Sequence, residues 1–254
     1  MKENISVVIQ GPLDDRTYEA IDCYQDFAEV IVSTWSTGED YSLLDKKSSK
    51  SKFKLITSDY PKNMSNIINY GSIYYISQTL LQGCLAASSP YILKTRSDEL
   101  YPNLDIFIDN VKKFPDRLHT TDNGFWKIHP FCLSGHIFLD SKQNMIEALS
   151  LIIDYCYKNK FTNLEIEICE QIFGYFFMLI REPVNFNQLN WKEIFRKYVY
   201  ITRCADLPGH LHSGQSSWGR GFNRSKEPYP CGRKEMPNGC HDIKQLYQHI
   251  NEII

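Results

Sequence analysis

Ile5-Ser6-Val7-Val8-Ile9-Gln10-Gly11-Pro12 is the stretch that decides the fold of this 254-residue chain. It is rich in β-branched residues and closes with Gly-Pro, so it predicts a buried strand that ends in a tight turn. Three similar apolar runs follow, at 29–35, 53–57 and 91–95, and helices are expected at 16–27 and 67–87. Strands that alternate with helices in this way predict βαβ units and a mainly parallel sheet.

The second half of the chain continues the pattern with weaker signals. We expect a strand at 135–139 and helices at 104–114, 142–158, 164–180 and 242–253. From Pro208 to Gly239 the composition shifts to Gly, Pro, Ser, His and Arg, which predicts a long ordered loop. The predicted fold class is therefore α/β, a mainly parallel sheet flanked by helices with a C-terminal loop and helix annex.

The composition narrows the class of protein. Hydrophobic residues make up 43% and charged residues 23%, as in ordinary globular domains. A net charge of −2 gives no electrostatic reason to expect nucleic-acid binding. No apolar run approaches the roughly 20 residues that span a bilayer, and the N-terminus lacks signal-peptide features, so we expect a cytoplasmic protein.

Eight cysteines are scattered at irregular spacing. Four of them lie among apolar neighbours, which favours small buried core residues: Cys23, Cys84, Cys156 and Cys169. Cys231, Cys240 and His241 lie in a polar segment, where a zinc site is the alternative although no CxxC pair is present.

Polar residues follow each of the first four expected strands. In an open parallel sheet, ligands bind outside the carboxyl ends of the strands. Gly11 would let the backbone approach a flat ring, and Asp59 could accept hydrogen bonds from a base or ribose. The alternative is that strand ends are polar because they meet solvent. The four strand ends are Gln10-Gly11-Pro12, Ser33-Thr34-Trp35, Ser58-Asp59 and Arg96-Ser97-Asp98-Glu99.

Asp98 is the strongest single candidate because it directly follows an apolar strand. A carboxylate there could bind Mn²⁺ or Mg²⁺, and the cation would offset the charge of a departing diphosphate. Arg96 is two positions earlier, so on extended backbone it points to the same side. Arg96 could pair with Asp98 or bind a phosphate; the alternative is a structural ion pair without a ligand.

Two later segments offer further candidates. Glu167 and Glu170 share one face of an expected helix, and Glu170 is favoured as the base that takes a proton from an acceptor hydroxyl. The alternative is an acidic first turn stabilised by the helix dipole. In the annex, Arg220 and Arg224 suit a lid over a diphosphate, with His212 as a metal ligand; a surface loop is the alternative.

Several catalytic motifs are absent from the sequence: GxxxxGK[ST], GxGxxG after the first strand, GxSxG and HExxH. Their absence disfavours an ATPase, a dehydrogenase, a hydrolase of the nucleophile-elbow type and a zinc protease.

Three motifs in order resemble the WavE family of lipopolysaccharide and capsule synthesis: residues 5–12 with Gln-Gly-Pro, residues 30–35 with Ser-Thr-Trp, and Lys94-Thr95-Arg96-Ser97-Asp98. The resemblance covers about the first 140 residues and is echoed by Ser134-Gly135-His136 and Glu170-Gln171. It implies a GT-A-like fold that uses an activated sugar. Residues 96–98 fall where such enzymes carry Asp-x-Asp, and only Asp98 matches. Glu170 falls where they often carry an acidic base.

The resemblance implies one domain over 1–254. Its parts would be a nucleotide-sugar-binding part at 1–100, an acceptor-binding part at 101–205 and a lid or annex at 206–254. The donor would be held by Gln10, Gly11, Pro12, Thr34, Asp59, Arg96, Arg220 and Arg224.

The expected function is inverting glycosyl transfer from a nucleotide sugar to a hydroxyl of a surface glycan. The transferase would be of the hexosyltransferase type. The acceptor would be an oligosaccharide or a lipid-linked glycan, with peripheral contact at the inner face of the cell membrane. Two rivals stay open: a nucleotidyl- or phosphosugar transferase on the same fold, and a non-catalytic carbohydrate-binding protein.

Overall fold

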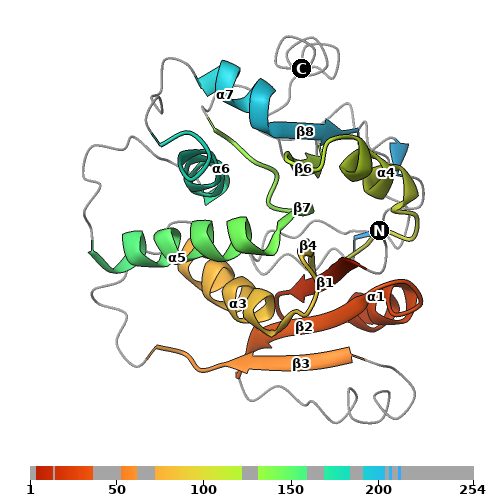
Figure 1. The fold of residues 1–254 in the computed structure, drawn as a ribbon. Coiled ribbons are helices and arrows are strands. Elements are labelled where there is room, and N and C mark those ends of the chain that lie inside the picture. Colours follow the sequence, from red (N-terminus) through yellow and green to blue (C-terminus); the bar gives the residue numbers. More distant parts are fainter. Residues whose placement is uncertain are drawn as a thin grey trace, which may run out of the picture.

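A computed structural model describes residues 4–13, 15–36, 53–61, 72–121, 131–158, 169–183, 191–203, 206–207 and 211–212. The elements in chain order are β1 (Ile5–Gln10), α1 (Asp15–Tyr24), β2 (Glu29–Trp35), β3 (Phe53–Ser58), α3 (Ile73–Ala86), β4 (Tyr91–Arg96), β5 (Glu99–Leu100), α4 (Asp105–Lys113), β6 (Leu118–Thr121), β7 (Phe138–Ser141), α5 (Lys142–Lys158), α6 (Cys169–Leu179), α7 (Trp191–Tyr198), β8 (Val199–Thr202) and β9 (Leu211–His212) (Figure 1).

The main sheet has seven strands in the order β3-β2-β1-β4-β7-β6-β8. Strands β3, β2, β1 and β4 pair in parallel, as do β6 and β8, whereas β7 is antiparallel to both of its neighbours. The carboxyl ends of all the main-sheet strands except β7 therefore share one edge, which we call the carboxyl edge. The expectation of an α/β fold with a mainly parallel sheet is confirmed.

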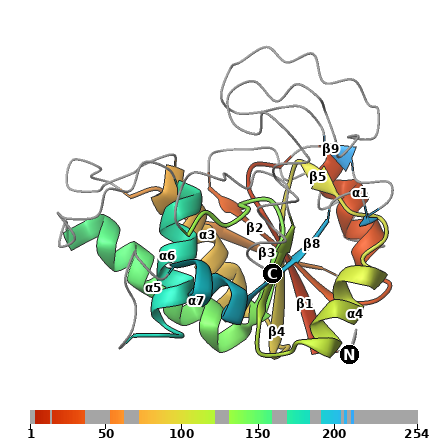
Figure 2. The same ribbon diagram turned by 90° about the horizontal axis from the view of Figure 1, so that it is seen from above.

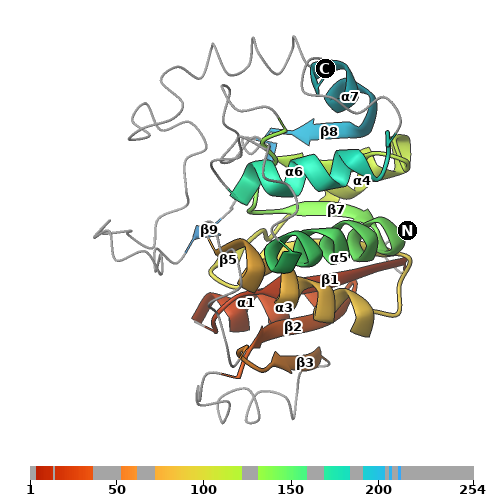
Figure 3. The same cartoon turned by 90° about the vertical axis from the view of Figure 1, so that its left-hand side faces the viewer.

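Helices cover both faces of the sheet. Figure 2 shows α3, α5, α6 and α7 on one face and α1 and α4 on the other. A second, two-stranded sheet pairs β5 with β9, and Figure 3 shows it beyond one end of the main-sheet strands. Because β5 follows β4 after two residues, this small sheet lies at the carboxyl edge.

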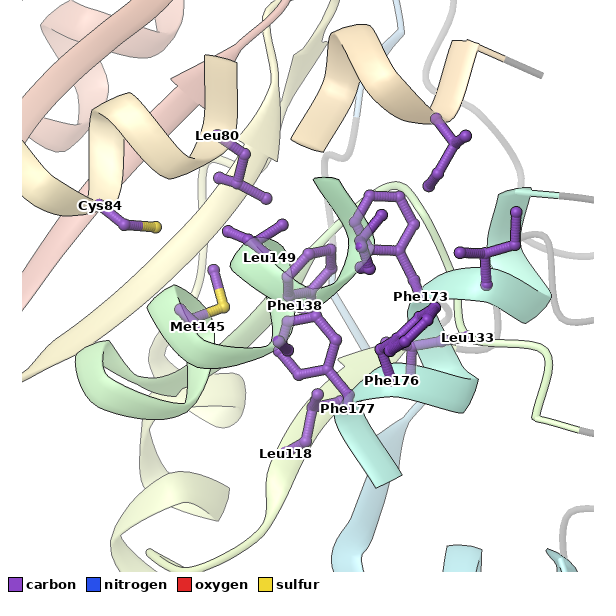
Figure 4. Close-up of a cluster of buried hydrophobic side chains, with 14 of the residues drawn as sticks. Leu80, Cys84, Leu118, Leu133, Phe138, Met145, Leu149, Phe173, Phe176 and Phe177 are labelled. Carbon is purple, nitrogen blue, oxygen red and sulfur yellow. The ribbon is translucent and has the colours of Figure 1, made fainter. Parts of the chain in front are cut away.

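The larger hydrophobic core lies between the sheet and α3, α5 and α6. Figure 4 shows Leu80, Met145 and Phe177, one from each helix, gathered around Phe138 of β7. The rings of Phe138 and Phe177 are 5.6 Å apart at their centroids and meet edge to face, a favourable aromatic geometry. The second core packs α1 and α4 on the opposite face.

A glycine sets how closely α3 approaches the sheet. A Cβ atom at Gly83 would lie 2.5 Å from Cγ1 of Val8 and 3.2 Å from Cβ of Ser33, so a larger residue would push the helix away. This close contact brings Thr79 of α3 over the end of β1, where its hydroxyl accepts a hydrogen bond of 3.1 Å from the Gln10 amide. The helix thereby fixes one of the predicted site residues.

The first four predicted strands and the helix at 142–158 are confirmed almost residue for residue. The strand expected at 135–139 begins instead at Phe138. The Lys94 ammonium group donates to the carbonyls of Gly135 and His136, which accounts for these groups not joining the ladder. Strands β6 and β8 and helix α7 were not predicted. The expected loop from Pro208 to Gly239 lies, apart from Leu211 and His212, outside the described residues, as does the helix at 242–253.

Cys84 and Cys156 are buried free thiols, as the sequence predicted, whereas Cys23 is a free thiol that is only half-buried, and the side chain of Cys169 lies outside the described structure. Within the described part of the chain, no helix combines the length and apolar character needed to cross a membrane.

Candidate functional site

The ends of β1 and β4 lie side by side at the carboxyl edge, where Gln10 is in register with Arg96. Two backbone hydrogen bonds lock the turn: Gly11 N–H to the Ser33 carbonyl at 3.3 Å, and Ser97 N–H to the Gln10 carbonyl at 3.0 Å. Gly11 has φ 135°, and a Cβ there would lie 2.5 Å from Oγ of Ser97. Only glycine fits without strain at this point, where the chain turns away from β1.

Arg96 and Asp98 form a two-pronged ion pair. Nε of Arg96 donates to Oδ1 of Asp98 at 2.8 Å, and Nη2 donates to Oδ2 at 2.7 Å, so the fork of the guanidinium matches the carboxylate. The side chain of Arg96 is 34% exposed, whereas Asp98 as a residue is only 8% exposed. In the described part of the chain, Nη1 of Arg96 has no hydrogen-bond partner.

Arg96 is held in its positively charged form. Burial opposes the positive charge, but hydrogen bonding and attraction from Asp98, and then attraction from Glu99, more than offset this and raise the pKa of Arg96 above its ordinary value. Arg96 is therefore a permanent cation that is held in one orientation at the carboxyl edge.

Glu99 sits beside this pair with a fully buried side chain. Its Oε2 accepts a 2.8 Å hydrogen bond from the Tyr101 hydroxyl, and its Oε1 contacts Nδ1 of His136 and lies 3.9 Å from Nε of Arg96. Lys94 contacts the backbone of the same His136 segment. Arg96 thus lies between two carboxylates, Asp98 and Glu99, while Lys94 is held by backbone carbonyls beside them.

A different group of side chains occupies the ends of β2 and β3. The Ser36 hydroxyl donates to Oδ1 of Asp59 at 2.9 Å. The Trp35 ring stacks on Tyr60 with centroids 4.8 Å apart, and Tyr60 is 48% exposed. Strands β4 and β3 are three strand spacings apart in the sheet, roughly 14 Å, so Arg96 lies at the centre of the carboxyl edge and this aromatic pair lies at one end of it.

The structure brings part of the sequence-predicted site together. Gln10, Gly11, Arg96 and Asp98 are neighbours at the β1–β4 junction. Thr34 is buried near the end of β2, Pro12 is exposed just after β1, and Asp59 is exposed at the far end of the same edge.

The structure does not describe the side chains of several other residues that the sequence predicted for the site. Glu170 lies in the first turn of α6 and His212 pairs with Glu99 through the β5–β9 ladder, but their side chains lie outside the described structure. Six further candidates lie wholly outside it: Glu167, Arg220, Arg224, Cys231, Cys240 and His241. Their proposed roles stay predictions.

The described residues do not fit a metal centre as they are arranged. Each oxygen of Asp98 accepts a hydrogen bond from Arg96, and both oxygens of Glu99 are engaged by protein groups. Within the described ranges, no three His, Cys, Asp or Glu residues are grouped so that they could hold a metal ion. The chemistry of the site is therefore derived below from protein groups alone.

Three residues of this edge were not picked out from the sequence: Glu99 as a buried partner, Tyr60 and His136. The only signal for His136 was its place in Ser134-Gly135-His136, just before an expected strand. Its link to Glu99 spans 37 positions and arises from the antiparallel pairing of β4 with β7, which the sequence pattern does not reveal.

No protein-family model matches the sequence, and no curated protein matches it significantly. Similar solved structures include mouse xyloside xylosyltransferase 1 in its apo form, which is 12% identical over 80% of this chain and 86% of that chain, with a TM-score of 0.44. Glucosyl-3-phosphoglycerate synthase from Mycobacterium tuberculosis, in complex with Mn²⁺, UDP and phosphoglyceric acid, is 10% identical over 79% and 68%, with a TM-score of 0.44.

A third similar structure is 4-diphosphocytidyl-2C-methyl-D-erythritol synthase from Anaerococcus prevotii, which is 10% identical over 80% of this chain and 87% of that chain, with a TM-score of 0.41. At these identities and TM-scores the likeness assigns no activity to this chain. The WavE resemblance rests on its motifs alone, and the function has to be argued from the site.

Proposed function

We propose that this protein transfers a sugar from a nucleotide-sugar donor to a hydroxyl of a growing surface glycan, such as lipopolysaccharide or capsule. The observation that carries the proposal is the β1–β4 junction, where Arg96 is held by Asp98 with one guanidinium nitrogen left over for a ligand. A fixed cation with spare donors at the carboxyl ends of parallel strands is suited to bind a phosphate.

The end of the carboxyl edge and its centre suit the two ends of a donor. Tyr60, which stacks on the buried Trp35, is an exposed aromatic ring, and base stacking on such a ring is worth about 1–3 kcal/mol. Asp59 lies beside it, where a carboxylate can accept hydrogen bonds from a base or ribose. With the nucleoside at the ends of β2 and β3, its diphosphate would extend towards Gln10 and Arg96.

The proposed chemistry needs positive charge beside the bond that joins the sugar to the diphosphate of the donor. As the bond between the anomeric carbon and the diphosphate oxygen opens, negative charge grows on the diphosphate. A guanidinium that is already oriented stabilises this charge without reorganising during the reaction. In this account Arg96 contacts the diphosphate, and Asp98 is a positioning residue that holds it in place.

The remaining parts of the proposal come from the sequence. Glu170 is its candidate base for inversion, Arg220 and Arg224 form its lid, and a lipid-linked acceptor would bring the cytoplasmic enzyme to the inner face of the membrane. Dependence on Mn²⁺ or Mg²⁺, with Asp98 and His212 as ligands, stays a prediction that assays with and without the ions would check.

The direct test is to incubate the protein with a panel of nucleotide sugars and to identify the released nucleotide. We expect a nucleoside diphosphate, or a monophosphate from a CMP-sugar. Asp98→Asn keeps the size of the side chain but loses its charge, so turnover should fall about 10- to 100-fold.

Asp109→Asn, on the exposed face of α4, is the matched control and should leave turnover unchanged. Release of pyrophosphate would instead indicate a nucleotidyltransferase. Full turnover by Asp98→Asn would contradict the role given to the Arg96–Asp98 pair.

A further inference from the structure

The contact between Glu99 and His136 has the geometry of a carboxylate that orients a histidine. Glu99 is fully buried, and its Oε2 is fixed by the Tyr101 hydroxyl at 2.8 Å, which leaves Oε1 aimed at Nδ1 of His136. His136 itself is 22% exposed and lies at the carboxyl edge, just before β7. Packing of the hydrophobic core gives no reason for a buried carboxylate to hold a partly exposed imidazole, so the contact points to a further role.

The carboxylate decides which ring nitrogen is basic. Because Oε1 can only accept, Nδ1 of His136 carries the proton and donates it, and in the neutral imidazole Nε2 then bears the lone pair. The two carbonyls that accept from Lys94 fix the backbone on which this ring is mounted. Glu99 thus determines the tautomer of His136, and Lys94 fixes the backbone that carries its side chain. Neither residue has a role in the proposed function described so far.

The Glu99 oxygen that His136 contacts serves two groups at the carboxyl edge. Arg96 lies 3.9 Å from the same Glu99 oxygen that His136 contacts, so this carboxylate is already shared with one permanent cation. When a proton arrives at Nε2, the resulting imidazolium is stabilised by the full negative charge of Glu99 at Nδ1. A ring that a carboxylate orients at Nδ1 is suited to act as a general base through Nε2.

We propose that His136 is the general base that activates the acceptor hydroxyl, and that Glu99 is the residue that positions it. The inference rests on the proposed function and gives the base role to His136 in place of Glu170. The acceptor O–H proton passes to Nε2, and the oxygen lone pair forms the bond to the anomeric carbon. The carbon–oxygen bond to the diphosphate breaks, its electron pair leaves with the diphosphate beside Arg96, and the imidazolium later releases the proton to water.

The test compares sugar transfer and nucleotide binding in the full chain. His136→Asn keeps a donor towards Glu99 but has no basic nitrogen. Transfer should fall about 100- to 10,000-fold, while the Kd for a nucleoside diphosphate stays within about threefold. Added imidazole should restore part of the activity. Glu170→Gln is the rival variant, and its loss of transfer should be at least tenfold smaller than that of His136→Asn.

Glu99→Gln should lower kcat about 10- to 100-fold and leave the KM for the donor unchanged, because it loosens the ring without touching the nucleotide. Should either variant fail to fold, carbethoxylation of the wild-type protein, located on His136 by mass spectrometry, should block transfer without weakening nucleotide binding.

Transfer at the wild-type rate by folded His136→Asn would overturn this inference, as would equal loss of transfer and of nucleotide binding. Loss of transfer in Glu170→Gln alone would return the role to Glu170. A wild-type protein that releases no nucleotide from any donor would instead refute the proposed function itself, which is a distinct result.

Discussion

The two edges of the main sheet both hold carboxylates beside basic groups, but they use them differently. At the edge where β1, β2 and β4 begin, which we call the amino edge, Glu29 accepts hydrogen bonds from Lys54 at 2.6 Å, from the Ser88 amide at 2.8 Å and from Ser6. At the carboxyl edge, Asp98 accepts two hydrogen bonds from Arg96, its neighbour two positions away in the sequence, and Nη1 of that arginine is not used in the pair.

The difference lies in which parts of the chain are joined. Glu29 of β2 connects Ser6 of β1, Lys54 of β3 and Ser88 just before β4, so four segments that are distant in sequence meet at one carboxylate. The Arg96–Asp98 pair joins neighbours in sequence and adds little to holding the sheet together. The amino edge therefore stabilises the fold, whereas the carboxyl edge holds the groups to which the proposed function assigns the chemistry.

The largest effect on stability is expected at the second ion pair of the amino edge, between Arg181 and Asp140. Both side chains are buried, and Arg181 also donates to the Phe177 carbonyl at 2.9 Å. Arg181→Met leaves Asp140 without its cation, so the free energy of unfolding measured in urea should fall by about 3–5 kcal/mol.

Lys112→Met, which breaks the exposed Lys112–Asp109 pair, is the matched control and should cost less than about 1 kcal/mol. Sugar transfer by the folded Arg181→Met protein should be unchanged. A large loss of activity without a loss of stability would break the distinction between the two edges.

A smaller and pH-dependent effect is expected at Glu29. Burial opposes ionisation of this carboxyl, but its hydrogen bonds from Lys54, Ser6 and Ser88 outweigh burial and lower the pKa of Glu29 from 4.5 to about 2. The ionised group therefore stabilises the fold fully above pH 4.5, and this contribution is lost as the pH falls towards 2.

Glu29→Gln should cost about 2 kcal/mol of unfolding free energy at neutral pH. Chemical denaturation at a series of pH values should show the gap between the variant and the wild type narrowing below pH 4.5. A gap of constant size across that range would mean that the charge of Glu29 contributes nothing.

Most of the parallel half of the fold could be predicted from the sequence, because each of its strands is an apolar run closed by polar residues. The antiparallel part could not. Strand β6 has only four residues and includes His119, so it lacks the alternation that marks a strand. Strand β8 follows α7 directly at Val199, with no glycine or proline to mark the change.

The candidate site could likewise be predicted only where local sequence patterns reveal it. Gln10, Arg96 and Asp98 were found because strand ends can be recognised locally, and the Arg96–Asp98 pairing follows from their spacing of two. The Glu99–His136 contact depends on β7 returning alongside β4, which is set by packing of Phe138 against α6 and not by any local signal.

Calorimetric titration with a nucleoside diphosphate tests the central claim most directly, because it asks whether the carboxyl edge binds the donor. The wild-type protein should bind, Arg96→Gln should bind about tenfold more weakly, which is about 1.4 kcal/mol, and Lys54→Gln at the amino edge should bind as the wild type does. Equal affinity of Arg96→Gln and the wild type, or weaker binding by Lys54→Gln alone, would contradict the account.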